Sequence, residues 1–345
     1  MAPTAASAQR PSGYLSGPVF DGVLIIFAPA IAVVAAKILF GTSFSEEPLH
    51  AGDSLATILL GTMLMAHLVL TFARSHGNSR IFWAHPWRFT LVPLLLLAGM
   101  LTSTWFLVFI GVLTTCWDEW HSGAQTFGLC RIYESRAGND PREGRRLDLW
   151  MNMVVWLGPL LGGVTLIDHA TTLGEDFESV SPVLMEAIPY QAAVWQRTIT
   201  QLAVLTGVVS TVVYIGAHWR MARRGARVSV QKVALMVTTG AVSIYAWGFH
   251  SIAEAFFVMN VFHYPQYFGL VWLTERENML RRLSLAKARN GTAILLFAFL
   301  AVPFSIGLVL DRMPLTDNTL AFFLLLSLLH FWYDGFIWSV RRKMV

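Results

Sequence analysis

Long apolar runs make up nearly the whole chain, and short segments that hold most of the charged residues separate them. A run of about 18 or more apolar residues is long enough to cross a bilayer as an α-helix. The pattern therefore predicts an all-α fold, a polytopic integral membrane helical bundle. We predict about ten transmembrane spans, at residues 20–41, 54–73, 89–103, 104–130, 148–167, 194–217, 231–249, 252–275, 291–310 and 318–340.

The positions of the basic residues favour ten spans over nine, the number that results if 89–115 is one long helix. With ten spans and a cytoplasmic N-terminus, all but three of the 25 Lys and Arg lie in cytoplasmic segments or at the adjoining helix ends. The exceptions are Lys37, Arg197 and Arg312. Such an excess of positive charge is typical of cytoplasmic loops. Nine spans would move every later basic loop outside, so we predict that both termini are cytoplasmic.

This scheme divides the chain into a cytoplasmic N-terminal tail at 1–19, a single transmembrane domain at 20–340 and a basic cytoplasmic tail at 341–345. The longest stretch outside the predicted spans is an acidic external loop at about 168–193. We expect a polytopic protein of the bacterial inner (cytoplasmic) membrane, with membrane lipid around it.

Composition excludes several other classes of protein. Hydrophobic residues make up 55% of the chain and charged residues 13%, against about 25% charged residues in soluble domains. This is neither a disordered chain nor an ordinary soluble globule. The net charge of +4 is spread over the loops between spans, so nucleic-acid binding is not expected. Cys116 and Cys130 form no CxxC motif.

Four histidines inside predicted spans lie at a similar depth. His67, His121, His263 and His330 each precede the next arginine of a cytoplasmic segment by seven to thirteen residues. At about 1.5 Å per residue, all four lie roughly 10–20 Å from the inner surface. Ionisable residues within spans are rare and usually functional. Imidazoles that converge from separate helices are a common way to build a metal site in a bundle, so we predict these four as metal ligands in the cytoplasmic half of the bilayer.

Polar residues accompany two of these histidines at helical spacing. Asp118 and Gln125 flank His121 at three and four residues, on the same face of the helix. Tyr267 follows His263 by four residues. We predict Asp118, Tyr267 and Gln125 as catalytic groups beside the metal.

Two further residues are predicted as metal ligands. Asp334 follows His330 by four residues and is the leading carboxylate ligand. His76 lies just beyond the end of the second span, where it could close the site from the cytoplasmic side.

The donor types indicate the chemistry. Neutral imidazole suits iron, copper and zinc, and a histidine-rich site with one carboxylate and open positions suits non-haem iron(II) and oxygen. Iron is therefore the preferred cofactor, with copper, zinc or haem as alternatives. A site within the bilayer implies a lipophilic small-molecule substrate, such as a fatty chain or an isoprenoid. The predicted function is a membrane-bound metal-dependent oxidoreductase or oxygenase, a reaction that would accommodate a redox partner.

Two other functions stay open at this point. A haem protein could use two of the histidines as axial ligands, although no CxxCH motif for covalent haem is present. A transporter for a metal ion or protons could use a relay of His, Asp and Glu residues. His250 and Glu254, four residues apart near an outer turn, could belong to such a relay. The histidines could also be structural residues that only make hydrogen bonds between helices.

In general character the chain resembles the histidine-rich membrane oxygenases. It has none of the HxxxH and HxxHH boxes of the fatty-acid desaturases and hydroxylases. It is also similar in type to the Brp/Blh-type bacterial β-carotene cleavage enzymes, which are apolar, have many spans and carry scattered single histidines. The resemblance favours an iron-dependent oxygenase. It matches no motif residue by residue, so no site residue is carried over from it.

Overall fold

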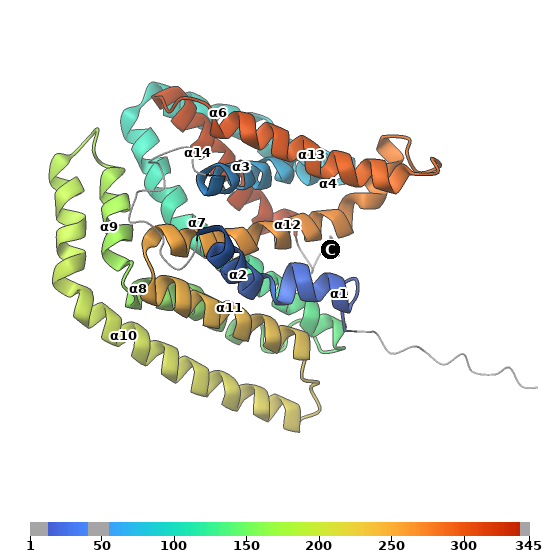
Figure 1. Cartoon of the computed structure of the whole chain (residues 1–345), viewed down its shortest axis with the longest axis horizontal. Coiled ribbons are helices and arrows are strands. Elements are labelled where there is room, and N and C mark those ends of the chain that lie inside the picture. The colour runs from blue at the N-terminus through green and yellow to red at the C-terminus, as the bar shows by residue number, and fades with distance from the viewer. Residues whose placement is uncertain (1–12, 41–54, 339–345) are drawn as a thin grey trace, which may run out of the picture.

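The computed structural model describes residues 13–40 and 55–338, and over these residues the chain is helical without strands. The predicted all-α fold is confirmed. The helices form one bundle (Figure 1). In chain order they are α1 (Pro18–Asp21), η1 (Gly22–Ile26), α2 (Ala28–Phe40), α3 (Leu55–Ser75), α4 (Ser79–Ala84), α5 (Pro86–Phe89), α6 (Leu91–Thr102), α7 (Thr104–Arg136), α8 (Arg145–Gly162), α9 (Leu166–Glu175), α10 (Pro182–Arg223), α11 (Val230–Phe249), α12 (Ile252–Arg282), α13 (Gly291–Asp311) and α14 (Asp317–Ile337). The predicted basic tail at 341–345 lies outside the described residues.

Several of these helices could cross a membrane. α3, α10, α11, α13 and α14 are long and apolar enough to do so, and two bent pairs raise the number to seven. One pair joins α1 and η1 to α2 with a bend of 62°, and the other joins α8 to α9 with a bend of 89°. These helices are compatible with an integral membrane protein. α7 and α12 are also long, with 33 and 31 residues, but they carry buried ionisable side chains.

Two features near the helix ends bear on the predicted spans. The chain breaks at Ser103, whose backbone is extended and whose hydroxyl accepts a hydrogen bond from the N–H of Phe106, so 89–115 is not one helix. The prediction of a loop at 168–193 is wrong, because α9 and the first turns of α10 make most of this segment helical. Ser181 caps α10 and Pro182 follows at the first helical position, where its lack of an N–H costs nothing.

α12 runs through the middle of the bundle (Figure 1) and packs against α2, α3, α11 and α13. Buried aromatic and aliphatic side chains of α12, including Phe257, Val258 and Phe262, lie in the largest apolar cluster. α13 lies along α3, and α10 packs on α8 and α9 at the outside. The close approach of α13 to α3 depends on Gly307, because a Cβ there would collide with the backbone of Thr62 and Ala66.

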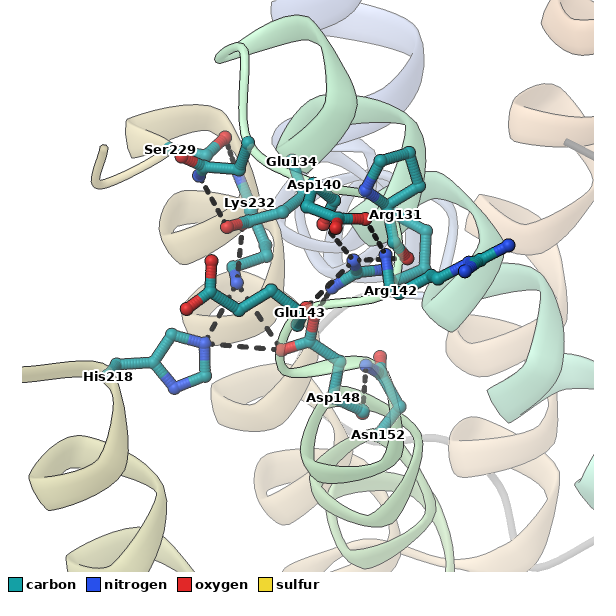
Figure 2. A network of polar contacts seen from close by, with 12 residues as sticks. Arg131, Glu134, Asp140, Arg142, Glu143, Asp148, Asn152, His218, Ser229 and Lys232 are labelled. Carbon is teal, nitrogen blue, oxygen red and sulfur yellow. Dashed lines mark hydrogen bonds and ion pairs between the residues drawn. The ribbon is translucent and has the colours of Figure 1, made fainter. Parts of the chain in front are cut away.

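A buried network of charges joins α7, α8, α10 and α11 at one end (Figure 2). Asp148 on α8 is fully buried and pairs with Arg131 of α7. Its Oδ1 accepts a hydrogen bond from the Tyr214 hydroxyl at 2.7 Å and lies 3.3 Å from Lys232 Nζ. Lys232 Nζ is also 2.6 Å from Glu134 Oε2. Buried charges are costly unless they are paired, so these contacts hold the four helices in one arrangement.

Candidate metal centre

Four helices that are far apart in the sequence each place one histidine at the same point inside the bundle. His67 lies on α3, His121 on α7, His263 on α12 and His330 on α14, and all four are buried. One ring nitrogen of each lies within 4.8 Å of those of the other three. The structure therefore brings together the four histidines that the sequence singled out by their depth.

Helical periodicity explains why the imidazole of α3 points inward. His67, Leu70, Thr71 and Arg74 are all buried and recur at spacings of three and four residues, which puts them on one face. That face meets α12 and α14. α12 itself is buried on most sides, so His263 has protein all around it.

The four imidazole rings lie close together. Ring centroids are 4.2 Å apart for His67 and His330, 4.6 Å for His121 and His330, and 5.0 Å for His67 and His263. Nε2 of His121 lies 3.0 Å from Nε2 of His330. Both ring nitrogens of His67 and both of His263 are buried without a hydrogen-bond partner among the described residues. Such unpartnered groups are rare in proteins and cost about 1–3 kcal/mol each.

This donor set fits a transition-metal ion. Imidazole nitrogens bind such ions at about 2.0–2.1 Å, so two of them on one ion are at most about 4 Å apart. The nitrogens of the four histidines, within 4.8 Å of one another, are close to that spacing. A metal ion here would also give a partner to one of the two unpartnered nitrogens of His67 and to one of those of His263.

A chain of hydrogen bonds orients His330. The hydroxyl of Tyr267 donates to Oδ1 of Asp334 at 3.1 Å, and Trp338 Nε1 donates to the same oxygen at 2.9 Å. Tyr267 has then used its only proton, so it must accept the hydrogen bond that joins it to Thr71 Oγ1 at 2.9 Å. Thr71 in turn must accept from Nδ1 of His330. This fixes the tautomer with a lone pair on Nε2, which is the nitrogen that faces the other histidines.

Asp334 lies at the edge of the histidine group. Its Oδ2 is 4.0 Å from Nε2 of His121 and 3.9 Å from Nε2 of His330. These distances are too long for hydrogen bonds. The predicted carboxylate is therefore next to the site, in a position from which it could become a ligand or exchange a proton with one.

The predicted catalytic residues lie at different places around the site. Tyr267 belongs to the chain of hydrogen bonds that orients His330. The amide nitrogen of Gln125 donates to the carbonyl of His263 at 3.1 Å and to Gln266 Oε1 at 3.2 Å. Gln125 Oε1 is buried and has no hydrogen-bond partner in the described part of the chain. Asp118 is not a member of the histidine group that the described residues form.

His76 lies apart from the four histidines. Its ring packs against Phe89, Nδ1 is 2.9 Å from Ser75 Oγ, and Nε2 is 3.1 Å from the carbonyl of Phe89. The structure does not bring it into the group, because the chain turns away after α3 and its ring nitrogens already have partners. The fifth predicted histidine ligand is thus displaced from the site.

His250 and Glu254 form a separate polar cluster. Nδ1 of His250 is 2.9 Å from Glu254 Oε2, and Lys37 Nζ on α2 is 2.6 Å from Glu254 Oε1. Glu254 is buried and paired on both oxygens. These contacts give His250 and Glu254 a structural role, because the ion pair of Glu254 with Lys37 joins α12 to α2.

A cavity of about 190 Å³ adjoins the histidine group. His121, Tyr267 and Asp334 line its inner end. Trp120 and Gly335, which are exposed, line its outer edge. The cavity therefore leads from the surface of the bundle, between α7 and α14, to the candidate metal centre.

Sequence reasoning missed Thr71 and Trp338. Thr71 follows His67 by four residues and Trp338 follows Asp334 by four, so helical spacing could have placed both on the right faces. A threonine or tryptophan in an apolar helix is common, however, and only the fold shows that these two contact His330 and Asp334.

Comparison with protein-family models, with curated proteins and with solved structures finds no match for this chain. The functional argument therefore depends on the geometry of the site.

Proposed function

We propose that this protein is a membrane-embedded, metal-dependent oxidoreductase or oxygenase that acts on a lipid-soluble substrate such as a fatty chain or an isoprenoid. The observation that carries the proposal is the group of four buried imidazoles, two of which have no hydrogen-bond partner on either ring nitrogen. Non-haem iron is the metal that best fits a histidine-rich site with a neighbouring carboxylate.

His67, His121, His263 and His330 would hold the metal, which when bound supplies a centre where oxygen and substrate can react. Thr71 orients His330 by accepting a hydrogen bond from Nδ1. Oδ2 of Asp334 is the group placed to accept or return a proton beside the ligands. The apolar surroundings exclude water, which would otherwise compete with the substrate.

The packing of the imidazoles argues against haem. The centroids of His67 and His121 are 6.5 Å apart, but the His263 ring lies 5.0 and 5.4 Å from these two, and the His330 ring lies 4.2 and 4.6 Å from them. His263 and His330 therefore occupy the space beside this pair that a macrocycle would need. Transport has less support, because the polar cluster around Glu254 is fully paired and separate from the histidines.

The first test is elemental analysis and a visible absorption spectrum of the detergent-purified protein. We compare wild type with His67→Ala and His263→Ala, and use His169→Ala as the control. His169 is a histidine of α9 that hydrogen-bonds the carbonyl of Thr165 and packs on Trp247.

We expect stoichiometric iron without a Soret band in wild type and in the control, and loss of iron in the other two variants. A Soret band would favour the haem protein. Folded wild-type protein that binds no metal would refute the proposal. Oxygen uptake with apolar chains as substrates then tests the reaction.

We also propose that the chain crosses a bacterial inner membrane ten times with both termini in the cytoplasm. The one-sided distribution of Lys and Arg supports this topology. Single cysteines at Ala286 and Met313, in a background without Cys116 and Cys130, test it in intact cells. A membrane-impermeant thiol reagent should label the cysteine at 313 and leave the one at 286 unlabelled. The reverse pattern would invert the topology.

A further inference from the structure

The lining of the cavity beside the candidate metal centre extends furthest along α7. On α7 its lining residues recur at spacings of three and four from Trp117 to Ile132, so they form one stripe along the helix. The fifteen-residue separation of these two corresponds to about 22 Å. His121 lies near the Trp117 end, and the lining continues along α7 for eleven residues beyond it, a helical rise of about 16 Å.

We call this cavity the groove, and its lining is mostly apolar and aromatic. Among the described residues that line it, Asp334 is the only carboxylate, and none is a lysine or an arginine. The polar members lie close to the histidines, whereas Leu129, Ile132 and Trp338 line the rest. A charged headgroup would find no counter-charge along most of the groove, but a hydrocarbon chain would find apolar contacts throughout.

We infer that this groove binds one extended hydrocarbon chain of the substrate, which enters sideways between α7 and α14, and that Gly128 and Gly335 set its width. The inference rests on the proposed function, since the groove ends at the candidate metal centre. It adds the route of entry, the linear shape of the substrate and two residues that determine specificity.

The two glycines lie where larger side chains would close the groove. Gly128 is on α7 and Gly335 on α14, and both line the cavity. A Cβ at either position would meet no atom within 4 Å. Larger residues would therefore fit the fold without a backbone clash, and their side chains would occupy space next to the bound chain.

Photolabelling of the full-length protein in lipid nanodiscs tests this. The probe is a long-chain fatty acid with a diazirine in the middle of its chain, and mass spectrometry locates the labelled residues. The variants are Gly128→Leu and Gly335→Leu, with Gly128→Ala as an intermediate size. Gly216→Leu is the control, because Gly216 is an exposed glycine of α10 that also has no atom within 4 Å of a Cβ and does not line the groove. Metal content is measured on every sample.

We expect labels on the groove residues of α7 and α14 in wild type and in Gly216→Leu. Labelling should fall about tenfold or more in both groove leucine variants and by less in Gly128→Ala, at unchanged metal content. Excess unlabelled fatty acid should compete with the probe. Groove labelling that is unaffected by Gly128→Leu would overturn the inference. Labelling that excess unlabelled fatty acid does not displace would also overturn it, since the probe would then react from the surrounding lipid and not from a bound position.

The metal measurement separates this inference from the proposed function. Wild type that holds metal but takes up no label in the groove would refute the chain-binding groove alone. Wild type that takes up the label and holds no metal would refute the proposed function and leave the groove as a chain-binding site.

Discussion

Nε2 of His121 lies 3.0 Å from Nε2 of His330 at the centre of the bundle. Two imidazole nitrogens at this distance share a hydrogen bond only if one of them carries a proton, whereas two metal ligands must both present lone pairs. The orientation of His330 by Thr71 leaves its Nε2 with a lone pair, so the deprotonation of His121 Nε2 is the change that metal binding requires.

Removal of the metal should destabilise the protein. A ligand that binds only the folded state at a free concentration of 100 times its Kd contributes about 2.7 kcal/mol to the free energy of unfolding. We therefore expect a chelator to lower the Tm of the wild type and readdition of iron(II) to restore it. The Tm of His121→Ala should not respond to either. Equal responses of wild type and variant would mean that the metal acts elsewhere.

Thr71→Val should weaken metal binding while it keeps the shape of the side chain. It removes the hydroxyl that joins His330 to Tyr267, and loss of such a partner of a metal ligand typically costs 10–100-fold in affinity, as an order of magnitude. Titration with iron(II) or a spectroscopically visible substitute such as cobalt(II) measures this. Thr239→Val is the control, since the Thr239 hydroxyl is buried and has no hydrogen-bond partner within residues 13–40 and 55–338, so its loss should cost nothing. Similar metal affinities of the two variants would show that the Thr71 hydroxyl does not support metal binding.

Asp148→Asn should destabilise the fold and leave metal affinity unchanged. The substitution keeps the size of the side chain but removes the carboxylate that pairs with the buried Arg131, and it leaves Lys232 with Glu134 as its remaining counter-charge among the described residues. Breaking a buried pair in this way costs about 3–5 kcal/mol in the free energy of unfolding. Thermal unfolding in detergent should show a clear fall in Tm.

The matched control for that change is Glu277→Gln. Glu277 and Arg276 form an exposed pair with an N–O distance of 3.0 Å, and such pairs contribute about 0–1 kcal/mol. A fall in Tm as small for Asp148→Asn as for this control would mean that the buried network contributes little to stability.

Gly307→Ala should separate α13 from α3 and lower both stability and metal content. Its Cβ would collide with backbone atoms of Thr62 and Ala66, and Ala66 directly precedes His67. Gly216→Ala, at a position with open space around the Cβ, should have no such effect. The Tm and the iron content of the two variants provide the comparison. Unchanged iron in Gly307→Ala would show that α3 can shift without disturbing His67.

The sequence alone determined the fold class and the residues of interest. Apolar runs predict helices because a backbone in an apolar environment must satisfy its own hydrogen bonds. The break at Ser103 agrees with the predicted division between 89–103 and 104–130, whereas the ten predicted spans compare with five to seven helices or bent pairs that are long and apolar enough to cross a membrane. The shared depth of His67, His121, His263 and His330 followed from helical rise, because depth depends only on distance along each helix from a charged end.

Only the tertiary structure decided which of these residues meet. Depth says nothing about the direction in which a helix faces or which helices are neighbours. Counting put His76 just beyond the end of the second span, but it could not show whether the ring still reaches the four histidines. Its distance from the group results from the turn after α3. The role of Thr71 depends on contacts between α3, α12 and α14, which no local pattern encodes. The groove likewise needs three helices at once, because a stripe of small and aromatic residues on α7 becomes a cavity only where α12 and α14 complete its walls.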